Sequence, residues 1–120
     1  LGVIAKLVER VIVMYGGVAV ETGSVETIFS DPAHPYTCGL LSAIPRIDRS
    51  THSRHKRLPT IPGVVPDLID MPEGCTFSDR CSLATDTCRT VPPVPVALSS
   101  HHQVACYHLD RARAQWQTGP

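Results

Sequence analysis

The chain has 120 residues, of which 42% are hydrophobic and 18% are charged, a balance that is typical of a folded domain. Its 11 basic and 11 acidic residues cancel, so overall charge does not favour nucleic acid or an anionic membrane as a partner. No apolar run reaches the roughly 18 residues that cross a bilayer, so the sequence predicts no membrane span.

The opening stretch LGVIAKLVERVIVMY contains an apolar run, but Glu9 and Arg10 interrupt it and no small-residue cleavage site follows. This pattern argues against a secretory signal peptide and favours a cytoplasmic protein. Apolar residues recur at helical spacing over residues 1–8, and the first residue is Leu1. We therefore expect the end of a helix that begins upstream, in a longer protein.

The residues that follow predict an antiparallel hairpin and two short helices. In RVIVMYGGVAVETG, two apolar β-branched runs flank Gly16 and Gly17, which supply the positive φ of a tight turn. Ser24 is expected to cap a helix that runs to Phe29, and a second helix is expected over 36–43. Helices and an antiparallel pair of strands together indicate an α+β fold.

Residues 46–59 predict a basic, polar linker. Five Lys or Arg in this stretch surround a single acid, Asp48, and no aromatic residue occurs among them. Contact with lipid head groups or nucleic acid is the alternative, although a run without aromatic residues is poorly suited to stacking on bases. The predicted segments of the chain are therefore residues 1–45, the linker 46–59, an extension over 60–108 and a frayed tail over 109–120. A final helix over LDRARAQWQ is the alternative for the tail, although that stretch has no strong apolar face.

The extension is rich in proline, with seven of the chain's 11 prolines between residues 59 and 95. Each proline lacks a backbone donor and fixes φ, so long helices are not expected there. Its first part, IPGVVPDLIDMPEG, predicts an extended arm that crosses a surface, anchored by Leu68, Ile69 and Met71. A segment with so little regular structure needs another source of stability.

The extension also holds four of the chain's five cysteines, which are Cys75, Cys81, Cys88 and Cys106. Disulfides are disfavoured by the missing secretory signal and by an odd fifth thiol, Cys38. Zinc usually takes cysteines from tight Cys-x2-Cys or Cys-x4-Cys turns, which are absent here. The alternative zinc ligands are the nearby imidazoles, which could equally face solvent, at His101, His102 and His108.

A four-iron, four-sulfur cluster is larger than a single ion and suits wider loops and four cysteines without histidine. Arg80 and Arg89 each lie beside a candidate ligand and could offset its negative charge, or they could be ordinary surface residues. Spacing alone leaves zinc and the cluster both open. Either would stabilise the segment, because structural metal sites contribute on the order of 10 kcal/mol to folding.

Two further stretches make the pattern specific to one family. The stretch RVIVMYGGVAVETGSVETIFSDPAHPYTCGLLSAIPRID, followed by IPGVVPDLIDMPEGCTFSDRCSLATDTC and VACYH, resembles the ATP-binding subunits of ABC importers for oligopeptides and dipeptides, whose nearer relatives carry nickel. The resemblance covers residues 1–108 and is weakest in the linker. It implies that residues 1–45 are the C-terminal remnant of an ABC nucleotide-binding domain.

The resemblance also implies what this chain holds and what it lacks. It implies a [4Fe-4S] cluster in the extension, with zinc as the alternative, on the ligands Cys75, Cys81, Cys88 and Cys106. No phosphate loop, signature motif or switch histidine occurs in the sequence, so ATP and Mg²⁺ would bind only elsewhere in the parent subunit and no catalytic residue is expected here. Cys38 departs from the family pattern and is interpreted as unligated, while His34 and Tyr36 are expected to cap and pack the short helix.

The function that the resemblance implies is transport. The parent subunit would hydrolyse ATP on the inner face of the plasma membrane, as a peripheral cytoplasmic protein, with permease subunits and a second ATP-binding subunit as partners and no nucleic acid. The cluster would brace the extension, with redox sensing as an alternative role. A contrasting hypothesis is a stand-alone zinc- or cluster-binding interaction module without a transport role.

Overall fold

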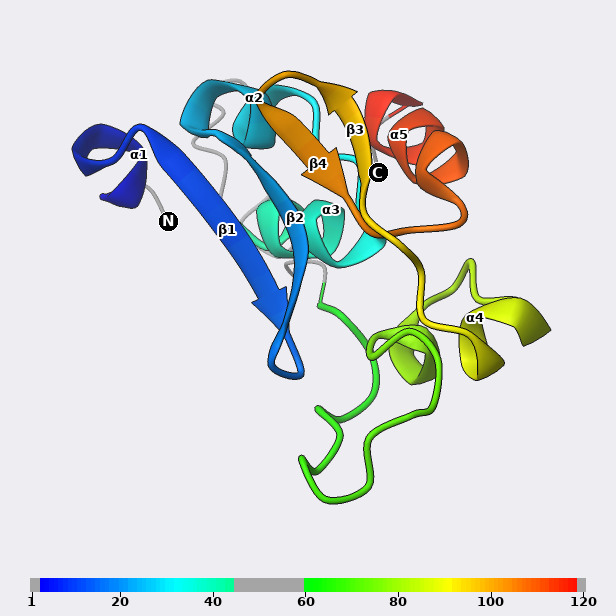
Figure 1. Ribbon diagram of the computed structural model, residues 1–120. Coiled ribbons are helices and arrows are strands. Elements are labelled where there is room, and N and C mark those ends of the chain that lie inside the picture. Colours follow the sequence, from blue (N-terminus) through cyan, green and yellow to red (C-terminus); the bar gives the residue numbers. More distant parts are fainter. Residues whose placement is uncertain (1–2, 45–59, 119–120) are drawn as a thin grey trace.

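A four-stranded antiparallel sheet organises the computed structural model, which describes residues 3–44 and 60–118 (Figure 1). The strand order in the sheet is β1-β2-β4-β3. The predicted α+β class is confirmed, while the predicted linker lies outside the described residues. The elements in chain order are α1 (Ile4–Leu7), β1 (Arg10–Tyr15), β2 (Val18–Ser24), α2 (Val25–Ser30), α3 (Pro35–Ser42), the 3-10 turn η1 (Ser78–Arg80), α4 (Asp86–Thr90), β3 (Val96–Ser99), β4 (His102–Val104) and α5 (Leu109–Thr118).

The predicted hairpin is confirmed as the pair of strands β1 and β2. Gly16 and Gly17 form its turn with φ of 58° and 80°, values that favour glycine. Along β1 the side chains alternate, so that Val13 and Tyr15 are buried while Ile12 and Met14 face outward. The hairpin therefore presents one face to the core.

Both predicted short helices are present, and each begins with a side-chain cap. Ser24 Oγ accepts a hydrogen bond from the Thr27 N–H at the start of α2. His34 Nδ1 accepts one from the Tyr36 N–H at the start of α3, where Pro35 occupies the first turn. The predicted capping and packing roles of His34 and Tyr36 are confirmed. None of the helices in the described part of the chain is long and apolar enough to cross a membrane.

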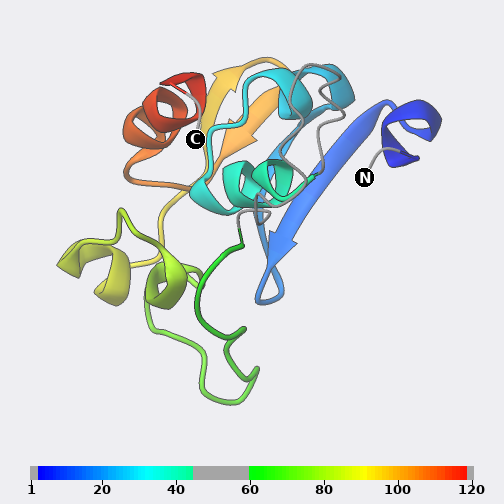
Figure 2. The ribbon, with the colours of Figure 1, turned by 180° about the vertical axis from the view of Figure 1, so that it is seen from behind.

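The extension contributes two strands that sequence reasoning missed. Strand β4 lies beside β2, with Glu21 opposite Val104 and Thr22 opposite Gln103, and β3 lies on the other side of β4. Figure 2 shows α2 and α3 over one face of this sheet, with the arm extending past the hairpin turn and α4 to one side of it. The hairpin and the extension thus share one sheet.

An aromatic cluster joins the hairpin, α3 and the cysteine-rich segment in one core. Tyr15 of β1 packs edge-on against Tyr36 of α3, with ring centroids 4.7 Å apart, and against Phe77, 5.1 Å away. Phe77 is 3% exposed and lies between Cys75 and the turn η1. Burying an aromatic ring of this size contributes about 1.5–3 kcal/mol, so Phe77 anchors the cysteine segment to the hairpin.

Two expectations about the extension are wrong. In place of a frayed tail over 109–120, helix α5 covers Leu109–Thr118, with Ala112 buried and Arg113 paired with Asp31 at 2.6 Å. The arm is extended as predicted, and Met71 is half-buried with its methyl group beside Gly16, but Leu68 and Ile69 are exposed rather than anchoring. Side chains of the helix thus find partners across the chain, whereas two of the three predicted anchors of the arm face solvent.

A buried carboxylate ties three parts of the fold together. Glu21 of β2 is 1% exposed, and its two oxygens accept hydrogen bonds from the backbone N–H groups of Ala33 at 2.8 Å and His34 at 3.0 Å. His102 Nε2 of β4 lies 2.6 Å from the first of these oxygens. Because a carboxylate only accepts, Nε2 is the donor. Glu21 therefore fixes the loop before α3 and the strand β4 against the hairpin.

Candidate metal centre

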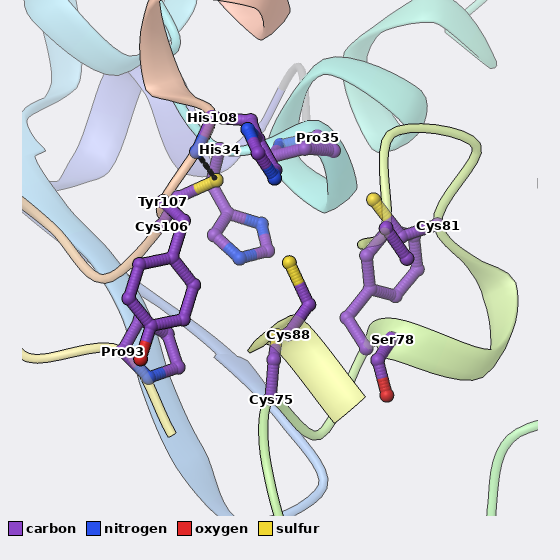
Figure 3. A pocket seen from close by; sticks show the side chains of 12 residues that line it. His34, Pro35, Cys75, Ser78, Cys81, Cys88, Pro93, Cys106, Tyr107 and His108 are labelled. Atoms are coloured by element: carbon purple, nitrogen blue, oxygen red, sulfur yellow. Dashed lines mark hydrogen bonds between the residues drawn. The ribbon is translucent and has the colours of Figure 1, made fainter. Parts of the chain in front are cut away.

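All four predicted ligand cysteines line one pocket between the start of α3 and the extension. Cys75 precedes η1, Cys81 follows it, Cys88 lies on α4, and Cys106 follows β4. Figure 3 shows these side chains around a common space, with two histidines beside them, His34 and His108. The remaining wall is largely apolar and is formed by Pro35, Phe77, Ala84, Pro93 and Tyr107, together with Ser78. The start of α3 and three stretches of the extension thus converge on one site.

A close approach of two backbone segments places Cys75 beside Cys88. The Cys75 N–H donates to the Cys88 carbonyl oxygen at 2.7 Å. A Cβ at Gly74 would collide with that carbonyl and would lie only 2.7 Å from the Arg89 carbonyl carbon. Because only glycine permits this contact, Gly74 determines how close the two cysteines come.

We therefore predict that Gly74→Ala separates the two segments. The clash involves backbone atoms, which cannot move as a flexible side chain can, so the Cys75–Cys88 hydrogen bond should break. The expected cost is about 1–3 kcal/mol in the free energy of unfolding, measured by urea denaturation. Gly17→Ala gives the cost of backbone strain without a clash, because its φ of 80° disfavours alanine although its Cβ would meet nothing within 4 Å, and it should leave the Cys75–Cys88 hydrogen bond intact. Equal hydrogen-exchange protection at Cys75 in wild type and Gly74→Ala would contradict this role.

Arg80 holds the turn that carries Cys81. Its guanidinium donates to the backbone oxygens of Pro62 at 3.0 Å and Ile61 at 3.1 Å, and to the Tyr15 hydroxyl at 3.2 Å. The arm and the hairpin tip are thus both fixed to the cysteine segment. The sequence predicted that Arg80 would either offset the charge of a ligand cysteine or be an ordinary surface residue. The contacts with the arm and the hairpin tip are neither of these. Arg89 is an exposed residue 3.9 Å from Asp86.

Burial and mutual repulsion disfavour negative charge on the pocket sulfurs. The pKa of Cys106 is raised to about 12, mainly by desolvation and in addition by the nearby sulfurs of Cys81, Cys75 and Cys88. Burial likewise raises the pKa of Cys75 and of Cys81. These thiols therefore stay protonated at neutral pH unless a positive charge binds among them.

Backbone N–H groups are directed at the same sulfurs and partly oppose this effect. Those of Phe77 and Ser78 lower the pKa of Cys75, and those of Leu83 and Ala84 lower the pKa of Cys81. The His108 N–H donates to Cys106 Sγ at 3.3 Å. Each donor lies two or three residues after its cysteine, so each cysteine loop supplies its own hydrogen bonds to the sulfur.

His34 was not predicted to belong to this site, yet it lines the pocket. It is 1% exposed, and burial lowers its pKa from 6.5 to about 4. The imidazole is therefore neutral at physiological pH, which leaves Nδ1 free to accept the capping hydrogen bond of α3. Its position just before the Pro35 of HPYT marked it as a cap but gave no sign that the ring faces the cysteines.

We predict that this histidine makes the fold less stable in mild acid. Below pH 6.5 the unfolded chain binds a proton that the folded chain excludes until about pH 4, so stability falls as the pH drops through this window. The expected loss is about 3 kcal/mol between pH 6.5 and 4, measured by urea unfolding at a series of pH values. His34→Asn keeps a cap and removes the titration, so its curve should be flatter than that of the wild type. Parallel curves of stability against pH for the wild type and His34→Asn would show that His34 is not the cause of the loss in acid.

The other candidate ligands lie apart from the pocket or in different roles. His102 is buried against Glu21 rather than facing solvent, and His101 is exposed. All five cysteines are free, so the disulfide alternative is wrong. Cys38 lies outside the pocket, with its sulfur 3.8 Å from the Pro32 oxygen, and burial raises its pKa to about 12. Within residues 3–44 and 60–118, no group of three or more His, Cys, Asp or Glu has the arrangement of ligands around one metal ion.

Comparison with known proteins identifies the class to which this fold and pocket belong. Three relatives are a peptide import ATP-binding protein of Brucella ovis, 44% identical over 108 residues, a peptide ABC transporter ATP-binding protein of Sinorhizobium fredii, 46% identical over 107, and the oligopeptide transport ATP-binding protein OppD of Haemophilus influenzae, 47% identical over 92. These matches cover 88%, 89% and 77% of the chain, and 32%, 31% and 27% of the respective relatives. The chain therefore spans about a third of the length of the relatives it matches.

The family model for the oligopeptide/dipeptide transporter C-terminal region matches residues 20–88, which is more than half of the chain. The chain belongs to this family. The resemblance found in the sequence is thereby confirmed. The matched residues include most of the hairpin's second strand, both capped helices and three of the pocket cysteines, Cys75, Cys81 and Cys88.

Proposed function

We propose that the chain is the C-terminal region of an ATP-binding subunit that powers peptide import, and that its four pocket cysteines hold a [4Fe-4S] cluster. The observation that carries the proposal is the convergence of the four thiols on one pocket in a member of this family. The relatives' names refer to peptide import and oligopeptide transport. ATP and Mg²⁺ would bind in the part of the subunit that supplies the phosphate loop.

The donor set and its surroundings support a cluster. Thiolates are the usual ligands of iron–sulfur clusters, and hydrogen bonds from backbone N–H groups to the sulfurs are a usual way in which proteins stabilise them. Both are available at Cys75, Cys81 and Cys106. Cluster binding would displace the thiol protons, supplying positive charge to a site that otherwise disfavours thiolates.

The spacing of the donors favours a cluster over zinc. A zinc ion with Zn–S bonds of about 2.3 Å draws its ligands into a tight tetrahedron. The four cysteines here are separated by gaps of five, six and seventeen residues and include none of the tight Cys-x2-Cys or Cys-x4-Cys turns from which zinc usually takes its ligands. A cluster spreads its four thiolates over a larger body, which suits a pocket whose walls come from four segments. When bound, the cluster would supply a covalent cross-link between the cysteine loops over 75–88 and Cys106, which follows β4.

Peptide uptake tests the transport proposal. In a strain that lacks the gene for this chain, uptake of labelled di- and oligopeptides should fall, and the wild-type gene should restore it. A gene truncated before residue 60 should fail to restore uptake, because strand β4 and the pocket would be lost. Normal peptide uptake in the deletion strain, or uptake restored by the truncated gene, would contradict the proposal. A defect confined to nickel uptake would contradict the peptide assignment alone.

The same proposal fixes the partners and the location. A peptide importer's ATP-binding subunit would lie peripherally on the cytoplasmic face of the membrane, against permease subunits and a second ATP-binding subunit. Affinity purification of the tagged chain from detergent-solubilised membranes should recover both kinds of subunit. Recovery of the chain alone from the aqueous fraction would favour the stand-alone module.

A further inference from the structure

Thr85 occupies the N-cap position of α4 but does not cap it. A threonine at this position usually accepts a hydrogen bond from an N–H of the first turn, yet the Thr85 side chain makes no such bond. Its Oγ1 lies instead 3.3 Å from Cys88 Sγ and 3.2 Å from His108 Nε2. The hydroxyl is therefore directed at a pocket sulfur, and the structure gives it no other role.

The chemistry of a ligand sulfur fixes the direction of both hydrogen bonds. A thiolate has no proton and can only accept, so with Cys88 ligated the single hydroxyl proton of Thr85 must point at Sγ. The Thr85 oxygen then has only lone pairs to offer His108. Nε2 must accordingly carry a proton and donate it. Ligation thus selects one chain of hydrogen bonds, from His108 Nε2–H to Thr85 Oγ1 and from Thr85 O–H to Cys88 Sγ.

His108 also links these hydrogen bonds to a second candidate ligand, Cys106. Its backbone N–H donates to Cys106 Sγ at 3.3 Å, while its ring contacts Thr85. One residue thus serves two sulfurs that come from different segments of the chain. Hydrogen bonds to the sulfurs of a cluster are among the features that set its reduction potential. They favour the reduced state, because reduction adds negative charge that the donors stabilise.

We propose that Thr85 is a positioning residue whose hydroxyl, oriented by His108, donates to Cys88 Sγ and raises the reduction potential of the cluster. The inference rests on the proposed function, since it requires a cluster on Cys88. The hydroxyl contributes a hydrogen bond, whereas the neighbouring Thr87 is exposed and serves as a natural comparison.

The test is a redox titration of the anaerobically purified full-length chain with dithionite as the source of electrons, followed by electron paramagnetic resonance. Thr85→Val keeps the shape of the side chain and removes the O–H, so the midpoint potential should become more negative. Thr85→Ser keeps the hydroxyl and should restore the wild-type potential. Thr87→Val should leave the potential unchanged.

Each outcome bears on the inference. Thr85→Val with wild-type iron content and an unchanged potential would overturn it and would leave the proposed cluster intact. A wild-type chain without iron would overturn the proposed function and this inference together. If Thr85→Val fails to retain iron, His108→Phe removes only the outer donor, and its potential should shift less but in the same direction. An unchanged potential in His108→Phe would then overturn the inference.

Discussion

Replacing all four pocket cysteines with serine is expected to unfold the extension at room temperature while the hairpin and α2 keep their local structure. A structural metal site contributes on the order of 10 kcal/mol, which is comparable to the whole stability of a small domain. The extension has little to replace it, because its strands β3 and β4 have four and three residues. Circular dichroism and thermal melting would measure the loss of folded structure, and limited proteolysis should then cut the chain at sites beyond residue 60.

Cys38→Ser is the matched control for this prediction. Cys38 is also a half-buried free thiol, but it lies outside the pocket. The free energy of unfolding of this variant should lie within about 1 kcal/mol of that of the wild type, because one small side chain replaces another. A four-serine variant that melts like Cys38→Ser would show that the thiols contribute nothing to the fold.

Glu21→Ala is expected to lower the free energy of unfolding by about 3–5 kcal/mol. The change leaves three buried donors without their acceptor, namely the N–H groups of Ala33 and His34 and the ring of His102. It also opens a cavity at a side chain that is 1% exposed. Urea unfolding of the full-length chain at neutral pH would measure the effect.

Two companion variants separate the hydrogen bonds from other effects. Glu21→Gln keeps the shape and one acceptor oxygen, so it should lose about 1–3 kcal/mol. Glu26→Ala removes an exposed carboxylate from the first turn of α2 and should cost about 0.3–1 kcal/mol. If Glu21→Ala were as mild as Glu26→Ala, the buried carboxylate would not be the tie between hairpin, loop and extension.

Local chemistry in the sequence was enough to predict the hairpin and the capped helices. Alternating apolar residues, the Gly16-Gly17 turn and the Ser24 cap act within a few residues of one another. Strand β4 could not be predicted from such local patterns, because it has three residues and pairs with β2, which lies about 80 residues earlier. Hydrophobicity alone also failed for Leu68 and Ile69, since burial depends on what the rest of the chain places beside them.

The candidate site was predictable in its ligands but not in its surroundings. The cysteine pattern, with the family resemblance, singled out four thiols that line one pocket. No sequence signal marked Glu21, whose partners are backbone N–H groups, or Thr85, whose hydroxyl is directed away from its expected cap. For His34 the sequence predicted the capping role but not the position of the ring in the pocket wall.

The metal content of the full-length chain after anaerobic purification tests the proposed cluster most directly. Iron, acid-labile sulfide and zinc would be measured on the same sample, with the four-serine variant as the blank. We predict about four iron and four sulfide atoms per chain, lost in the variant. One zinc per chain with no sulfide, or a folded chain with neither metal, would contradict it.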